Sequence, residues 1–111
     1  MKEQEFQHEK IERIVWMYWD QGFDRAPSLV KACYDSWVRQ NPGWRVIFLD
    51  CATVNEYLSG DTGWLNLKGL CLAHKSDLLR LYLLKEYGGA WVDATTFCMR
   101  PLDEWIPEFI E

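Results

Sequence analysis

The sequence predicts an α/β domain in which a mostly parallel sheet is flanked by helices. Short runs of β-branched and aromatic residues, at 13–19, 44–49 and 90–92, alternate with stretches of helical periodicity. A predicted helix joins the first two runs, and this strand–helix–strand pattern is typical of a parallel sheet. The chain has 111 residues, which is room for one domain. We assign this domain to residues 13–111 and interpret the charged residues 1–12 as a flexible leader.

The first half of the chain contains two strands and the helix between them. The strand over 13–19 ends where the polar residues that follow it begin. The helix begins near Pro27, a residue suited to a first helical turn, and ends at the Asn41-Pro42-Gly43 segment. The second strand then covers 44–49.

The second half is organised around one long helix. A short helix is expected over 54–58 and an irregular connection over 59–70. The helix from about Leu72 to Tyr87 ends at Gly88-Gly89, because glycine tolerates the left-handed backbone of a helix C-terminus. A strand at 90–92 follows, with an extended segment over 95–99 before the chain turns at residue 101.

Composition excludes several classes of function. The net charge is −5, so the chain offers no basic surface to nucleic acid. Its four cysteines form no Cys-x-x-Cys pair, which argues against a zinc site and favours reduced thiols. The first residues are charged and lead into no apolar segment, and no apolar run approaches the roughly 20 residues of a membrane span. We therefore expect a cytoplasmic protein, held at the inner face of the membrane where a partner recruits it.

Two charges on the long helix are candidate site residues. The helix is apolar nearly all round, so we expect it to be largely buried. At about 100° per residue, Asp77 and Arg80 share a face with Leu81 and Leu84, and this face is expected to point inward. Buried charges need a partner or a ligand. Both interpretations stay open: a structural ion pair, which is the commoner case, or a ligand site.

Two further candidates lie on the strands. Asp93 follows the strand at 90–92, and open parallel sheets bind ligands beyond the carboxyl ends of their strands. A carboxylate there suits a metal or a ribose hydroxyl, although aspartate also commonly caps turns. Trp16, in the first strand, is either a core residue or a stacking platform for a nucleobase.

Five segments, taken in order from about residue 11 to residue 105, resemble one known family. They are residues 14–22, 41–44, 73–80, 87–95 and 101–103. The stretch from Ser76 to Asp93 is the most specific, since Ser-Asp-x-x-Arg is followed by Tyr-Gly-Gly and an apolar strand ending in Asp. Together they resemble the capsular polysaccharide synthesis glycosyltransferases, bacterial relatives of the sugar transferases with a DXD motif.

The resemblance implies a GT-A fold, which is Rossmann-like, and transfer of a sugar from a nucleotide diphosphate sugar, above all a UDP-sugar, to the hydroxyl of a carbohydrate acceptor. By position, Trp16 would stack on the base and Asp77 would hold a hydroxyl of the ribose or the sugar. Arg80 would reach sugar or phosphate oxygens, and Asp93 would contact the ribose and a Mn²⁺ or Mg²⁺ ion. Asp93 and Arg80 are the expected catalytic residues.

The chain departs from the family pattern at two points. Thr95 stands where the DXD motif has its second Asp, so the metal site, Asp93 with Thr95, has one carboxylate fewer. The chain is also truncated relative to the usual family length, so that it is a fragment, works with another chain that supplies the acceptor half, or has lost activity. The alternative is a non-catalytic module that binds a nucleotide sugar or a partner.

Overall fold

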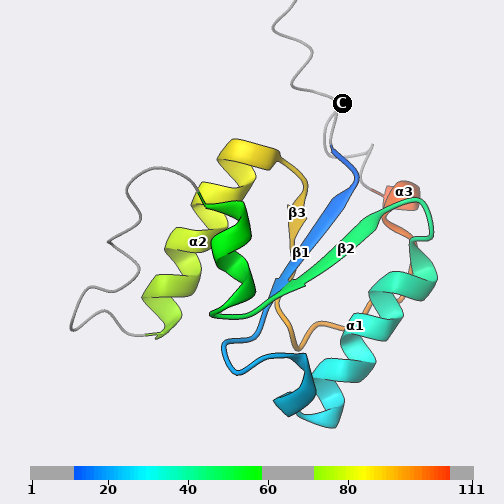
Figure 1. The fold of residues 1–111 in the computed structure, drawn as a ribbon. Coiled ribbons are helices and arrows are strands. Elements are labelled where there is room, and N and C mark those ends of the chain that lie inside the picture. Colours follow the sequence, from blue (N-terminus) through cyan, green and yellow to red (C-terminus); the bar gives the residue numbers. More distant parts are fainter. Residues whose placement is uncertain (1–11, 59–71, 106–111) are drawn as a thin grey trace, which may run out of the picture.

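The computed structural model describes residues 12–58 and 72–105, and its centre is a parallel sheet (Figure 1). The strands are β1 (Ile14–Tyr18), β2 (Arg45–Leu49) and β3 (Ala90–Trp91), in the spatial order β2-β1-β3. Both pairings are parallel, with Ile14 opposite Arg45 and Val15 opposite Ala90. The predicted fold class, a parallel α/β sheet flanked by helices, is confirmed.

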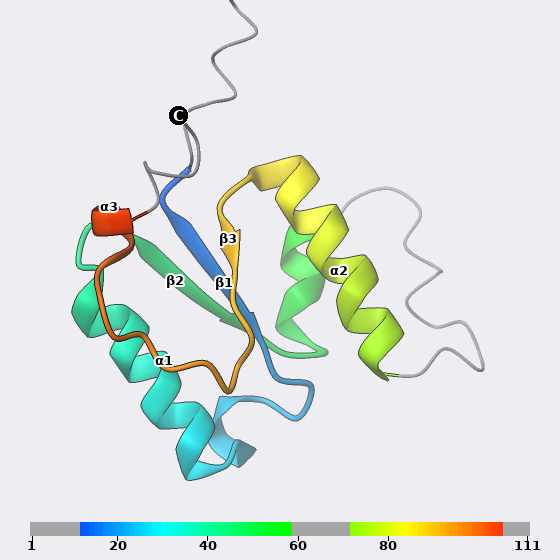
Figure 2. The same cartoon turned by 180° about the vertical axis from the view of Figure 1, so that it is seen from behind.

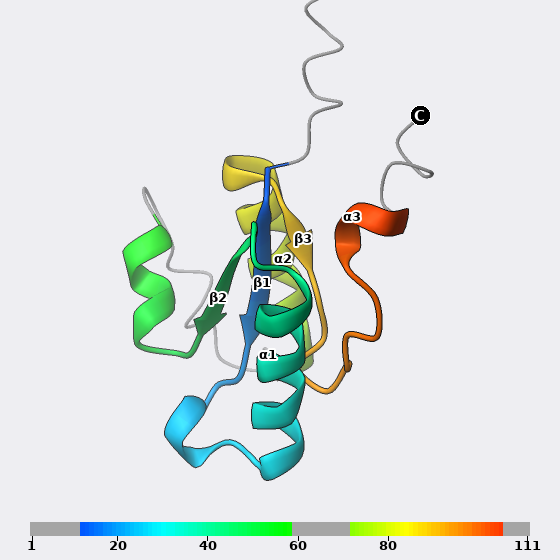
Figure 3. The same ribbon diagram turned by 90° about the vertical axis from the view of Figure 1, so that its right-hand side faces the viewer.

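Helices cover both faces of the sheet (Figure 3). Helix α1 (Ser28–Gln40) lies on one face, while α2 (Leu72–Tyr87) and the 3₁₀ helix η3 (Thr53–Tyr57) lie on the other. Side chains of β1 alternate between the two layers, as the period of a strand requires. Val15 and Met17 belong to the core on the α1 side, and Trp16 and Tyr18 to the core on the α2 side. The central strand is therefore buried on both faces.

The Gly88-Gly89 turn ends α2 as predicted. Both residues have a positive φ, of 77° and 97°. A Cβ on Gly89 would lie 2.6 Å from the carbonyl oxygen of Ile14, so this position also needs glycine for space. The turn thus brings β3 directly against β1.

The chain after β3 forms no further strand over 95–99, the segment that we expected to be extended. It turns at Asp93, whose carbonyl accepts a hydrogen bond from the Thr96 amide at 2.9 Å, and then runs along α1 (Figure 2). Trp37 on α1 donates its Nε1–H to the Thr96 carbonyl at 2.7 Å, and Ser36 accepts from the Cys98 amide at 2.8 Å. The backbone of this segment therefore bonds to side chains of α1 and not to a neighbouring strand.

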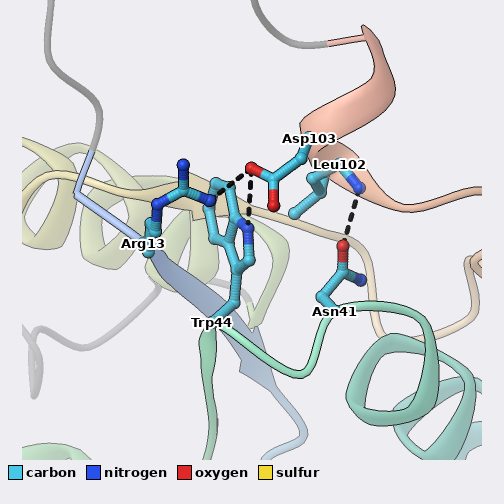
Figure 4. A network of polar contacts seen from close by, with 5 residues as sticks. All are labelled: Arg13, Asn41, Trp44, Leu102 and Asp103. Atoms are coloured by element: carbon cyan, nitrogen blue, oxygen red, sulfur yellow. Dashed lines mark hydrogen bonds and ion pairs between the residues drawn. The ribbon is translucent and has the colours of Figure 1, made fainter.

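A polar network holds the last described helix, α3 (Leu102–Trp105), against the rest of the domain (Figure 4). The buried Asn41 accepts a hydrogen bond from the Leu102 amide at 2.6 Å and donates one to the Trp37 carbonyl at 2.9 Å. Arg13 and the indole of Trp44 both reach Asp103. The start of β1 and the turn between α1 and β2 are therefore both bonded to α3. One further element, the 3₁₀ helix η2 (Phe23–Arg25), precedes α1.

The prediction that α2 is largely buried is wrong for the described structure. Over residues 75–87, where the side chains are described, only Leu79 and Leu83 are fully buried, whereas Leu78 and Leu81 are 38% and 62% exposed. The sheet is narrow, so α2 packs against it along one side only. Residues four positions apart, such as Leu79 and Leu83, lie on the same side of a helix and form the stripe that contacts the sheet. The predicted irregular connection over 59–70 and residues 1–11 of the predicted leader lie outside the described residues.

Candidate functional site

A cleft of about 400 Å³ opens at the carboxyl edge of the sheet, where β1 and β3 end. Parallel strands place their carboxyl ends at the same edge, so residues far apart in the sequence meet there. The lining comes from the exit of β1, the exit of β3 and one residue of α2: Tyr18, Trp19, Asp20, Gln21, Ser76, Asp93 and Ala94. Among the described residues, this lining contains two carboxylates and no basic side chain.

The exit of β1 is held in place through the neighbouring strand β2. The Trp19 amide donates to the Leu49 carbonyl at 2.9 Å, and the Cys51 amide donates to the Asp20 carbonyl at 3.3 Å. The Gly22 amide closes a turn by donating to the Trp19 carbonyl at 3.0 Å. The backbone of the cleft wall is thus fixed at successive residues.

Tyr18 and Asp20 form a hydrogen-bonded pair within this wall. The phenolic Oη of Tyr18 donates to Oδ1 of Asp20 at 2.6 Å. Burial, followed by this hydrogen bond to a carboxylate, raises the pKa of the Tyr18 phenol far above its ordinary value. Tyr18 therefore remains a hydrogen-bond donor at every physiological pH.

Asp93 lies at the boundary between two clefts. It follows β3, whose register continues through a hydrogen bond from the Val92 amide to the Trp16 carbonyl at 3.0 Å. Its side chain is exposed, and it also borders a second, largely apolar cleft of about 440 Å³ whose lining includes Trp37 and Trp91. Burial, with the nearby Asp93 charge as a smaller contribution, raises the pKa of the Cys33 thiol. The sequence-predicted position of Asp93 at a ligand-accessible strand end agrees with this geometry.

The donor atoms near Asp93 suit a divalent ion only when a ligand supplies further oxygens. Thr95 is exposed, and among the described residues no three His, Cys, Asp or Glu side chains are grouped to hold a metal. Magnesium sites, however, commonly use one or two carboxylates together with phosphate oxygens of the substrate. Asp93 supplies one carboxylate in the cleft, so it would hold such an ion only together with the oxygens of a diphosphate.

Asp77 and Arg80 do not face this cleft. Their side chains are 58% and 45% exposed, and they bond each other at 3.2 Å across one turn of α2. Neither lines the two clefts described above. The expectation that both charges point inward with Asp93 is therefore wrong for the described structure, because the buried stripe of α2 lies on a different side of the helix. The structural ion pair, the commoner of the two alternatives, is what the geometry shows.

Trp16 is also placed differently from its predicted role as a base-stacking platform. Its side chain has 0% exposure, and its indole donates to the Gly88 carbonyl at 2.8 Å. The rings of Tyr57 and Tyr87 pack against it at centroid distances of 5.3 and 5.6 Å. No face of the ring is left for a base. Trp19 is half-buried and, together with Tyr18, lines the cleft.

Sequence reasoning found Asp93 but missed the other six residues of the described lining: Tyr18, Trp19, Asp20, Gln21, Ser76 and Ala94. The sequence did contain a signal for Asp20, because the first strand ends at Asp20 just as the third ends at Asp93. Open parallel sheets bind ligands beyond the carboxyl ends of their strands, and this applies equally to both residues. The Tyr18–Asp20 spacing of two residues, which places both side chains on one face of a strand, was a second signal.

Comparison with known proteins identifies the family. The family model described as "Capsular polysaccharide synthesis protein" matches residues 1–109. The chain belongs to this family. Its curated relatives include the glycosyltransferase afumC of Aspergillus fumigatus, 35% identical over 82% of the chain, and the O-glycosyltransferase braB of Annulohypoxylon truncatum, 31% identical over 84%. A mimivirus glycosyltransferase, L373, is 26% identical over 86% of the chain.

The chain is much shorter than these relatives. It spans 26% of the length of the first of these proteins, 25% of the second and 40% of the third. They are fungal and viral, so they give no support to a bacterial source. No solved structure matches the chain significantly. Within residues 12–58 and 72–105, no helix has the length and apolar character that a bilayer crossing requires.

Proposed function

We propose that this member of the capsular polysaccharide synthesis family carries the donor-binding part of a glycosyltransferase, and that the cleft at the carboxyl edge of the sheet binds the nucleotide diphosphate sugar. The carrying observation is the position of Asp93: an exposed carboxylate at the end of β3, in a cleft shared with the end of β1. The names of the relatives, which are glycosyltransferases, support the same conclusion.

The cleft has the size and chemistry for such a ligand. Small-molecule sites commonly measure about 300–1,000 Å³ and combine apolar walls with a few placed polar groups. Here Trp19 supplies an aromatic surface, while Asp93 and Asp20 supply acceptors for hydroxyl groups. Trp19 takes the base-stacking role that the sequence suggested for Trp16.

The reaction is a displacement at the anomeric carbon of the donor. An acceptor hydroxyl forms the new C–O bond, the bond to the nucleoside diphosphate breaks, and the hydroxyl proton passes to a base outside the described site. Two relatives are named O-glycosyltransferases, which fits a hydroxyl acceptor. When bound, Mn²⁺ or Mg²⁺ would neutralise charge on the departing diphosphate, with Asp93 and Thr95 on the protein side.

The acceptor would be a carbohydrate, and capsule-type polysaccharide synthesis is the process that the family description suggests. The second cleft, beyond Asp93, leads away from the donor site along β3. In proteins as long as the relatives, further polypeptide would complete the acceptor side, either in the same chain or in a partner.

Calorimetry with UDP-glucose, with and without Mn²⁺, tests the proposal on the full 111-residue chain. We expect binding to the wild type, and at least tenfold weaker binding to Asp93→Ala, because a charged hydrogen bond to a ligand hydroxyl is lost. Asp77→Ala is the matched control, since this carboxylate lies outside the cleft and its removal should leave affinity within twofold. Equal affinities of wild type and Asp93→Ala would contradict the proposed site.

The same preparation separates catalysis from binding alone. Release of UDP from UDP-glucose in the presence of Mn²⁺ would show that the chain acts on its donor. Tight binding without any release, even with added sugar acceptors, is the outcome expected of a non-catalytic nucleotide-sugar-binding module.

A further inference from the structure

The pair formed by Tyr18 and Asp20 gives the cleft a second carboxylate besides Asp93. We infer that Asp20 accepts a hydrogen bond from a hydroxyl of the bound nucleotide sugar, on the ribose or on the sugar, and that Tyr18 is the residue that positions it. This inference rests on the proposed function, because it assigns a role within the same cleft.

The pair is rigid on both sides. Tyr18 is the last residue of β1 and only 8% of it is exposed, so its ring is fixed by the core on the α2 side. Its hydroxyl holds Oδ1 of Asp20 at 2.6 Å. The backbone of Asp20 is held in turn by the Cys51 amide. A carboxylate fixed at both its backbone and one oxygen loses little entropy when it meets a ligand.

The second carboxylate oxygen of Asp20 is available. Among the described residues, the hydrogen bond from Tyr18 is the one side-chain bond of Asp20, and Oδ2 accepts none. A carboxylate has about four acceptor sites. Asp20 is half-buried and lines the cleft, so its unused acceptor sites are reached from the cleft side.

Asp50, at the end of the neighbouring strand, shows what a purely structural aspartate looks like in this fold. Its Oδ1 accepts hydrogen bonds from the amides of Ala52 and Thr53, both at 2.8 Å, and these bonds lower the pKa of its carboxyl. Asp20 caps no backbone amide in the described part of the chain. The turn that follows β1 is closed instead by a backbone hydrogen bond, so Asp20 is not needed to form it.

Charge decides which part of the ligand meets Asp20. Within the described lining, the charged residues are Asp20 and Asp93, so this part of the cleft is negative and repels a bare diphosphate. Hydroxyl groups of the ribose or the sugar donate to carboxylates without this penalty. The hydroxyl-bearing part of the nucleotide sugar is therefore placed against Asp20.

Calorimetry with a panel of ligands tests the assignment. The probes are UDP-glucose and analogues that lack, one at a time, the ribose 2′-hydroxyl, the ribose 3′-hydroxyl or a glucose hydroxyl. We expect Asp20→Ala to bind UDP-glucose about tenfold more weakly than the wild type and Tyr18→Phe about three- to tenfold more weakly. With the analogue that lacks the recognised hydroxyl, both variants should bind as the wild type does.

Two matched controls identify effects that are merely structural. Tyr34→Phe removes a phenol that makes no side-chain hydrogen bond among the described residues, and Asp35→Asn neutralises an exposed carboxylate on α1. Both should bind the whole panel like the wild type, and thermal unfolding checks that every variant is folded.

The outcomes separate the two proposals. If the wild type binds UDP-glucose and Asp20→Ala binds it equally well, or loses the same factor for every analogue, the role of Asp20 is overturned while the donor site stands. If the wild type binds no nucleotide sugar, the proposed function is overturned, and the role of Asp20 falls with it.

Discussion

Replacement of Asn41 by alanine should lower the free energy of unfolding by about 2–4 kcal/mol. Asn41 is only 3% exposed, and it joins the end of α1 to the start of α3. Its loss leaves the Leu102 amide, now bonded at 2.6 Å, without a partner, and an unpaired buried donor costs about 1–3 kcal/mol. The lost donation to the Trp37 carbonyl at 2.9 Å and the small cavity supply the remainder.

Urea unfolding followed by far-ultraviolet circular dichroism measures this change through the transition midpoint at constant m-value. Asn55→Ala is the matched control, because Asn55 is exposed and makes one long hydrogen bond, to the Ala52 carbonyl at 3.3 Å. This control should cost no more than about 0.5 kcal/mol. If Asn41→Ala is as stable as Asn55→Ala, the network does not anchor the segment that follows Asp93.

Three further predictions concern the strand ends and α2. Gly89→Ala should destabilise the fold by at least about 2 kcal/mol in urea unfolding, since its φ is 97° and a Cβ would clash with the Ile14 carbonyl. Burial and Asp20 raise the pKa of Tyr18 in the folded state. The protonated Tyr18 phenol therefore contributes its full share of the folding free energy below its pKa in the unfolded chain, which is near 10. This contribution is lost as the pH rises above that pKa. Wild type should lose up to about 1.4 kcal/mol per pH unit more than Tyr18→Phe between pH 10 and 11; parallel stability curves would contradict this. Arg80→Ala should change stability by less than about 0.5 kcal/mol, because its ion pair is exposed; a larger loss in urea unfolding would mean that the pair contributes to the core.

The sequence was sufficient for the order and type of the main elements. Alternating short apolar runs and helical stretches predicted β1, α1, β2, α2 and β3, and Gly88-Gly89 marked the end of α2. These signals are local, because they depend on backbone preferences and on periodicity within one element. The contacts of the segment after β3 could not be predicted for the opposite reason: its hydrogen-bond partners are side chains of α1, roughly 60 positions earlier in the chain.

The site could be predicted only where a strand end marked it. Asp93 was identified because open parallel sheets bind ligands beyond the carboxyl ends of their strands, and the structure places Asp93 at such an end. The inward face of α2 could not be found from a helical wheel, because nearly every side of the helix carries a leucine. Packing selects the Leu79–Leu83 stripe, which leaves Asp77 and Arg80 outside. Trp16 and Trp19 are likewise equivalent by composition, and only the position at which β1 ends separates the core residue from the cleft residue.

An NMR titration of the ¹⁵N-labelled chain with UDP-glucose and Mg²⁺ tests directly whether the cleft is the donor site. We expect the largest amide shifts at the exits of β1 and β3, over residues 18–21 and 93–94, and at Ser76. Shifts concentrated instead on the outer face of α2, around Asp77 and Arg80, would contradict the assignment of the cleft as the donor site.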